Sequence, residues 1–420
     1  MGERKGEPTL MISELEVLLK ITRWILGIGL LLVGLGSPSG AMCQEGEDSS
    51  LSIEIHGMVA STFFLQNNSF GFGNGQSATF VADRTPTSDP WILGGDVRNS
   101  RVGVDLKGLP VEGDWTAMAH MEVDFFGGFN GTGPFSDEQP HLRLRSAYVE
   151  LARTGTSLRL GQAFAPLLGN IPVSLSHLVF PLGYASAGVV GWRYPGIFLS
   201  QRLRTSPGLS ADLKVAALRG SWTGPGDNLE QESAGESAAF PQLEARLDLK
   251  GTNGEAFRWS AYTVAHLDRK DLSGPEPTNR HLDRLSGKAL EFGARVETGR
   301  VTVQGNTYWG RAIGQQMGQM AQFGDISSHG GWGQVGYHFN GQWSVWVFAG
   351  LEDPNDQELL ENGGTSRLKN ESWAAMTRYA KGPMSVGLEC MGATTHWAEP
   401  GSAIRQQKGI QLSLSTVYQF

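Results

Sequence analysis

The chain has 420 residues, a formal net charge of −8, 18% charged residues and only two cysteines. The acidic balance without any basic run argues against a general nucleic-acid partner, and two cysteines exclude a disulfide framework. The mean hydropathy of −0.22 resembles that of a soluble protein, but a membrane barrel with a polar lumen averages to a similar value, so hydropathy alone does not exclude it.

The N-terminal region has the pattern of a secretory signal peptide. Lys20 and Arg23 precede an apolar run at residues 24–35, which small residues follow as far as Ala41. The run is too short to span a bilayer as a helix, which needs about 20 residues. We therefore predict a cleaved signal peptide at residues 1–41. Cleavage after Cys43 and a start at Met11 stay open as alternatives. Residues 42–51 are predicted to form a short periplasmic leader.

Residues 52–65 begin a pattern of period two, in which apolar Ile53, Ile55, Val59 and Phe63 alternate with other residues. Such alternation is typical of a strand with two unlike faces. Similar segments follow at residues 99–106, 115–126, 142–151, 157–164, 191–203, 210–219, 242–249, 256–267, 289–297, 300–309, 329–339, 342–351, 372–380, 384–397 and 409–420. We predict an all-β chain of about sixteen strands, with eighteen as the alternative.

Short and long connections alternate along the whole chain. The short ones are residues 107–114, 153–156, 205–209, 250–255, 298–299, 340–341 and 381–383, and longer polar or glycine-rich segments separate them. Soluble sandwiches have Greek-key crossings and lack this regularity. It is typical of transmembrane antiparallel β-barrels with short periplasmic turns and long extracellular loops. Residues 52–420 are therefore predicted to form one barrel domain in the outer membrane.

The last strand ends on two aromatic residues of the same parity, Tyr418 and Phe420. We predict that this strand closes the barrel against residues 52–65. Phe420 resembles the terminal signal read by the outer-membrane insertion machinery. Other aromatics near strand ends, Trp332 and Trp397 among them, are predicted to form girdles at the membrane interfaces.

Several stretches resemble the general trimeric porins of Gram-negative bacteria, nearest to the dicarboxylate-type porins. They are EIHGMVASTFF (54–64), NSRVGVDLKG (99–108), MEVDFFGGFNG (121–131), LRLRSAYVEL (142–151), LRLGQAFAPLLGN (158–170), WRYPGIFLSQRL (192–203) and the terminal aromatic strand. The resemblance implies a homotrimer of water-filled barrels whose third long loop, here residues 165–190, folds inward to narrow the pore. That loop contains no Asp or Glu, unlike strongly acidic constriction loops.

With the apolar residues assigned to lipid, several charged side chains project into the lumen. The predicted selectivity residues are Arg101, Arg143, Arg145, Arg159 and Arg193, with Glu122 and Asp124. Rings of arginine favour anions, whereas a ladder of salt bridges would only stiffen the wall, and both interpretations stay open. We predict a passive diffusion channel for small hydrophilic solutes with a mild anion preference. Alternatives are a channel selective for small carboxylates or phosphate, and a structural or adhesive barrel.

A barrel hydrolase is the least favoured hypothesis. His56, His120, His266 and His338 have the parity of lumen-facing residues, but the chain has no G-x-S-x-G, no H-E-x-x-H and no Cys/His cluster with metal-binding spacing. We interpret these histidines as polar lining. The sequence predicts no catalytic residue, no metal site and no cofactor, and its expected partners are membrane lipids, the insertion machinery and small solutes.

Overall fold

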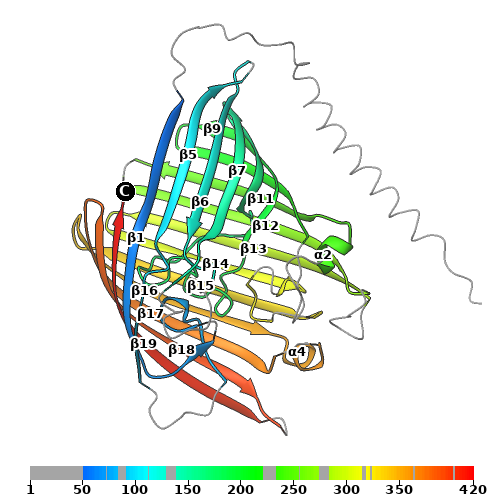
Figure 1. Cartoon of the computed structure of the whole chain (residues 1–420), viewed down its shortest axis with the longest axis vertical. Helices are drawn as coiled ribbons and strands as arrows, with labels where there is room; N and C mark the ends of the chain where they lie inside the picture. Colours follow the sequence, from blue (N-terminus) through cyan, green and yellow to red (C-terminus); the bar gives the residue numbers. More distant parts are fainter. Residues whose placement is uncertain are drawn as a thin grey trace, which may run out of the picture.

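The computed structural model describes residues 51–71, 73–83, 91–111, 113–128, 139–220, 233–254, 256–273, 283–314, 318–321, 324–362, 365–400 and 403–420. The predicted signal peptide and all but the last residue of the predicted leader lie outside these ranges. The described residues form a tall barrel of strongly tilted strands (Figure 1). None of the helices in the described ranges is long and apolar enough to cross a membrane.

One antiparallel sheet contains almost all of the strands. They are β1 (Ser52–Gln66), β4 (Ile92–Asp96), β5 (Arg101–Pro110), β6 (Thr116–Asp124), β7 (Arg143–Arg153), β8 (Thr156–Phe164), β9 (Arg193–Ser206), β10 (Leu209–Leu218), β11 (Gln242–Asn253), β12 (Phe257–Asp271), β13 (Arg284–Thr298), β14 (Val301–Arg311), β15 (Ser327–His338), β16 (Trp343–Pro354), β17 (Arg367–Lys381), β18 (Met384–Ala398) and β19 (Ile404–Gln419). Two short helices, α2 (Ala234–Ser237) and α4 (Asp356–Asn362), lie in the long connections.

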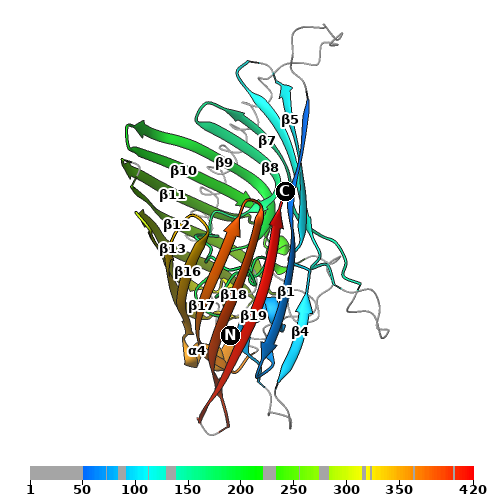
Figure 2. The same ribbon diagram turned by 90° about the vertical axis from the view of Figure 1, so that its left-hand side faces the viewer.

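The sheet closes on itself through β1. One edge of β1 pairs with β19, where Val59 lies opposite Tyr418, and the other edge pairs with β4 and β5 in succession. Figure 2 shows β19, β1 and β4 side by side at this seam. Because β4 and β5 together act as one interrupted strand, the described strands form a closed barrel of sixteen. The predicted strand number and the predicted closure by the last strand are confirmed.

The alternation of side chains places apolar residues outside and polar residues inside. In β1 the outward Ile53, Ile55 and Phe63 are each more than 60% exposed. In β19 the inward Ser413 and Ser415 are at most 2% exposed. An apolar outer wall of this extent is unstable in water but is solvated by lipid. The outer wall is thus that of a transmembrane barrel.

Tight turns join the strands at one end of the barrel. Only two residues separate β13 from β14 and two separate β17 from β18. Gly299 and Gly382 in these turns have φ values of 55° and 57°, which a side chain with a Cβ rarely adopts. Glycine at these positions therefore fits the predicted short turns.

Strand boundaries differ from prediction mainly at the opposite end. There β13, β17 and β19 each begin five residues earlier than predicted, at Arg284, Arg367 and Ile404. Residues beyond the apolar band face a polar environment on both sides, so the period-two signal ends while the hydrogen-bonded ladder continues. In addition, β4 lies within a segment that the sequence predicted as loop.

The barrel is partly filled from within. The segment containing β2 (Phe70–Gly71), a 3-10 helix η1 (Gly75–Ser77) and β3 (Phe80–Val81) packs with Val179, Phe180 and Leu182 and with inward side chains of β17 and β18. Trp332 and Trp397 are 5% and 7% exposed. These two tryptophans are therefore not part of an outer girdle, and that prediction was wrong because both have inward parity.

Candidate functional site

Residues 165–190, which make up most of the connection between β8 and β9, cross the lumen and are held by polar side chains of β11, β15 and β17 on the far wall. Glu244 of β11 accepts a hydrogen bond from Leu167 N at 2.7 Å. Gln334 of β15 donates to the carbonyl of Val173 and accepts from its amide, both at 2.8 Å. Farther along, Asn370 of β17 donates to the carbonyl of Ser186 at 3.1 Å. This loop, called the lumen loop below, is thus fixed to the wall at intervals.

Apolar contacts support the same placement. Leu175 packs into a cluster with Met58, Trp346 and Met376 on the inner wall. At Gly188, which has a φ of 84°, an added Cβ would meet Gly331 N at 2.3 Å. The loop backbone therefore lies directly against β15 there, and only glycine allows that approach. The remaining side of the barrel wall is formed by β5 to β9.

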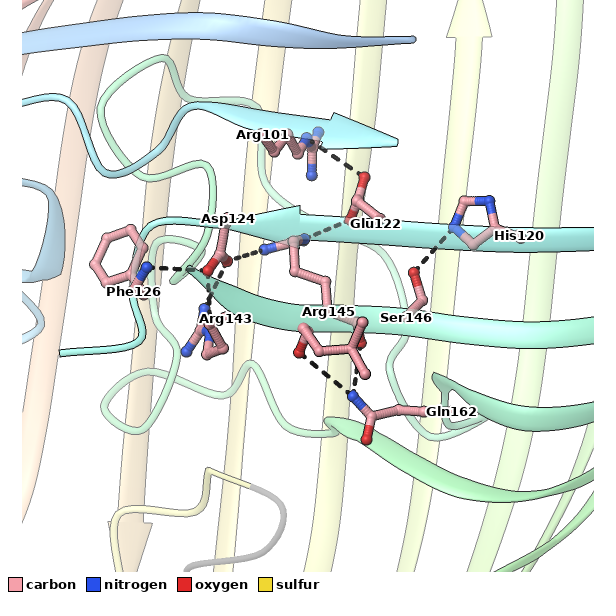
Figure 3. A network of polar contacts seen from close by, with 10 residues as sticks. Arg101, His120, Glu122, Asp124, Phe126, Arg143, Arg145, Ser146 and Gln162 are labelled. Atoms are coloured by element: carbon pink, nitrogen blue, oxygen red, sulfur yellow. Dashed lines mark hydrogen bonds and ion pairs between the residues drawn. The ribbon is translucent and has the colours of Figure 1, made fainter. Parts of the chain in front are cut away.

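That remaining side carries a cluster of charged groups (Figure 3). Arg143 of β7 donates to both oxygens of Asp124, from Nε at 3.0 Å and from Nη2 at 2.7 Å. Arg145 donates from Nη1 to Asp124 at 2.8 Å and from Nε to Glu122. Arg101 of β5 lies farther from Glu122, with Nε 3.7 Å from Oε2. We call these five residues, together with Arg193, the arginine wall.

Arg193 joins the wall through aromatic rings. Its guanidinium carbon lies 4.5 Å from the Trp192 ring centroid and 5.2 Å from that of Phe164. The same rings are approached by Arg143 and Arg145, at 5.8 and 5.9 Å. Arg193 is 6% exposed, and its Nε and Nη1 have no hydrogen-bond partner among the described residues. Its charge is therefore balanced less closely than those of Arg143 and Arg145.

A cavity of about 250 Å³ separates the arginine wall from the lumen loop. Arg101 and Arg145 line it on one side, and loop residues such as Leu168, Val173 and His177 line it on the other. No carboxylate is among its lining residues in the described part of the chain. The wall has four arginines and two carboxylates, a net charge of +2 (4 − 2), facing a loop with no Asp or Glu.

The structure separates Arg159 from the other predicted selectivity residues. Arg159 donates to Glu150 and stacks on Tyr148, with its guanidinium carbon 4.5 Å from the ring centroid. It lines a different cavity, of about 330 Å³, together with Lys214 and Arg246. The arginines at 101, 143, 145 and 193 thus form one group, and Arg159 belongs to another.

A β-bulge explains why Tyr148 and Glu150 were missed as lumen residues. In the pairing of β6 with β7, Glu122 lies opposite Ser146 while Val123 lies opposite Leu144, so Arg145 is the extra residue. Side chains beyond the bulge change face. The sequence carries this signal, because the apolar residues switch from even positions (Leu142, Leu144) to odd positions (Val149, Leu151) across Arg145.

The two predicted assembly residues lie at the barrel seam. Tyr418 is 53% exposed on the outer wall and Phe420 is 51% exposed. The Phe420 backbone exchanges two hydrogen bonds with Gly57 of β1, with N···O distances of 2.9 and 3.1 Å. The end of the chain is therefore part of the closing ladder.

No protein-family model matches the sequence, and no curated protein matches it. The structure, in contrast, is similar to solved outer-membrane proteins. The outer membrane channel DcaP of Acinetobacter baumannii gives a TM-score of 0.64 at 16% identity, covering 90% of this chain and 100% of that one. An anion-selective porin from Comamonas acidovorans gives 0.58 at 13% identity, covering 88% and 100%. Salmonella typhi OmpF, in complex with daunomycin, gives 0.55 at 10% identity, covering 90% and 100%.

At these identities the likeness concerns the fold. The strand number, the seam and the antiparallel order all agree with it. The resemblance that the sequence motifs indicated is confirmed at this level. The chain has the fold of the Gram-negative outer-membrane porins.

Proposed function

We propose that the protein is a passive diffusion channel of the Gram-negative outer membrane for small hydrophilic solutes, with a preference for anions. The observation that carries the proposal is the arginine wall, whose net charge of +2 faces an uncharged stretch of lumen loop across a cavity lined by Arg101 and Arg145. Fixed positive charge at a narrow point attracts anions and repels cations. Two proteins of similar fold are described as a channel and as an anion-selective porin.

The proposal is of a channel without catalytic chemistry, working by diffusion down a gradient. We further propose that three copies assemble in the membrane and that the terminal Phe420 is read by the insertion machinery, as the sequence resemblance implies. The apolar outer wall supports the membrane location. Light scattering of the detergent-solubilised protein tests the trimer, and a monomeric mass would contradict it.

Reversal potentials across a salt gradient in planar bilayers test the anion preference. Arg145→Gln removes a charge that lines the cavity, so the potential should shift toward that of a less anion-selective channel. Arg258→Gln is the matched control, because Arg258 is 66% exposed and pairs with Glu297 on strands that do not line the cavity. If neither the wild type nor the control variant forms an ohmic pore, the proposal that the protein is a channel is contradicted. Equal potentials in both variants would contradict the assigned role of the wall.

A channel selective for small carboxylates or phosphate is the second candidate. Arg101 favours it, because this arginine lines the cavity and its ion pair with Glu122 is long, at 3.7 Å. A guanidinium with free donors binds carboxylate or phosphate through two parallel hydrogen bonds. Millimolar succinate or phosphate should then block chloride current in a saturable manner, and Arg101→Gln should abolish the block. Current that is insensitive to both anions would leave only general diffusion.

A further inference from the structure

Two histidines and one aspartate meet on the inner face of the barrel, between the arginine wall and the end with the short turns. Asp105 of β5 lies between them, with Oδ1 2.6 Å from His120 Nδ1 and Oδ2 3.6 Å from His56 Nε2. One donor atom from each of the three side chains lies within 4.8 Å of the other two. We propose that His56, Asp105 and His120 bind a zinc ion.

Strand register brings the three side chains together. Asp105 lies directly opposite His120 in the pairing of β5 with β6. His56 lies opposite Gly103 in the pairing of β1 with β5. A Cβ on Gly103 would meet the His56 ring at 2.3 Å, so glycine leaves the space in which this ring lies across β5. The two imidazole rings are consequently stacked, with centroids 5.9 Å apart and planes at 17°.

The donor set suits zinc. Zinc takes imidazole nitrogen and carboxylate oxygen at about 2.0–2.2 Å in tetrahedral geometry, which needs donor atoms about 3.3 Å apart. The three donor atoms now lie within 4.8 Å of one another, so the side chains shift when they take up the ion. Three protein ligands leave a fourth position for water, as in zinc sites that remain open to exchange.

Ser146 provides the outer partner that ligand histidines usually have. Its Oγ lies 3.0 Å from Nε2 of His120, the ring nitrogen that faces away from Asp105. With a metal on Nδ1, Nε2 carries the proton and donates a hydrogen bond to the Oγ of Ser146. Such outer hydrogen bonds fix the tautomer and orientation of a ligand histidine. Figure 3 shows Ser146 and His120 in this contact.

Charge and access also permit a cation. Lys107 Nζ lies 3.8 Å from Asp105 but 2.5 Å from Glu54, so a separate carboxylate balances the lysine. The His56 side chain is 39% exposed, and those of Asp105 and His120 are 15% and 13% exposed. Because all three lie on the inner face, an ion arriving through the lumen reaches them. The inference does not depend on the transport role, since binding is measured on the solubilised barrel.

The test is equilibrium dialysis of the folded full chain in detergent against Zn²⁺, with the bound metal measured by mass spectrometry. The wild type should bind one saturable zinc per chain, and His56→Gln and His120→Gln should each lose it. His338→Gln is the matched control. This histidine also has the parity of lumen-facing residues but packs against Trp346 on another part of the wall, so its substitution should leave zinc binding unchanged. Ser146→Ala should weaken the affinity by about 10- to 100-fold.

Two further measurements separate the site from its alternatives. Co²⁺ in place of zinc should show the visible absorption of a low-symmetry site in the wild type and not in His56→Gln. Circular dichroism before and after heating shows whether each variant is folded. His56→Gln protein that is folded and still binds one zinc would overturn the inference. So would a wild type that takes up zinc without saturation, because its histidine–aspartate contact would then be an ordinary hydrogen bond.

Discussion

Substituting Asp124 by Asn tests the arginine wall in two independent ways. Asp124 is fully buried and accepts hydrogen bonds from Arg143, from Arg145 and from the amide of Phe126. Asparagine keeps an oxygen for the Phe126 amide but loses the charge. Removing one partner of a buried ion pair lowers the free energy of unfolding by about 3–5 kcal/mol. Because Arg145 retains Glu122 and the Arg143 side chain is 24% exposed, we expect a loss near the lower limit, about 3 kcal/mol.

The same substitution should increase anion selectivity. Removing one negative charge raises the net charge of the wall from +2 to +3 (4 − 1). A unit charge about 8 Å from a passing ion contributes about 0.5 kcal/mol in water. The effect is opposite for anions and cations, so their permeability ratio should change by about 1 kcal/mol, or about fivefold. The change should be measured near 0.1 M salt and should nearly disappear at 1 M, where the Debye length falls to about 3 Å.

Urea unfolding followed by tryptophan fluorescence measures the stability loss, and reversal potentials measure the selectivity. Glu297→Gln is the control, because Glu297 is 29% exposed and pairs with Arg258 and Arg295 on β12 and β13, which lie outside the wall. It should cost no more than about 1 kcal/mol and leave selectivity unchanged. If Asp124→Asn changes neither quantity, the wall is neither an ion-pair network nor a charge filter.

Other predictions concern the lumen loop, the seam and α4. Gln334→Ala removes both hydrogen bonds to Val173 and should increase current noise in single channels without lowering barrel yield; unchanged noise would mean that apolar packing alone holds the loop. Deleting Phe420 removes its two backbone bonds to β1 and should reduce folded yield far more than the conductance of the barrels that form, whereas a normal yield would contradict the assembly role. Burial raises the pKa of Glu358 in α4. The hydrogen bonds that its carboxylate accepts, led by that from Ser327 N, lower the pKa by a larger amount, so it lies below the usual 4.5. This contact therefore stabilises α4 above about pH 4.5 and is lost as pH falls through the lower, folded-state pKa. The protection of α4 amides against hydrogen exchange, relative to the intrinsic rate at each pH, should fall there in the wild type and depend less on pH in Glu358→Gln.

The sequence predicts the barrel well because its strongest signal is local. Alternation within 52–65 or 409–420 needs only neighbouring residues, and each strand must place one face in lipid and the other in the lumen. The position of β4 was missed because its sequence, ILGGD, has only two apolar residues and two glycines. The predicted strand boundaries are wrong where both faces of a strand are polar, as at the start of β19.

The geometry of the site depends on the pairing and register of neighbouring strands, which the period-two pattern within one strand does not reveal. Parity correctly indicates that Arg143 and Arg145 point inward, but their pairing with Asp124 depends on the bulge and the register of β6 with β7. Likewise, His56 and His120 were each expected in the lumen. Their meeting at Asp105 depends on two separate strand pairings and on Gly103. A motif search along the chain does not find such a group, because its members are 15 and 49 residues apart (120 − 105 and 105 − 56).

The seam between β1 and β19 has a consequence for the folding rate. Thr62 and Ser415 share a hydrogen bond at 2.9 Å although 353 positions separate them. Among the described strands of the barrel, every other pairing can form between strands that are near neighbours in the chain, but this one must wait for β19. Until it forms, both strands are open sheet edges that can pair with other molecules. Contacts of such long range form slowly, so refolding yield should be limited by competition between closure and aggregation and should fall as protein concentration rises.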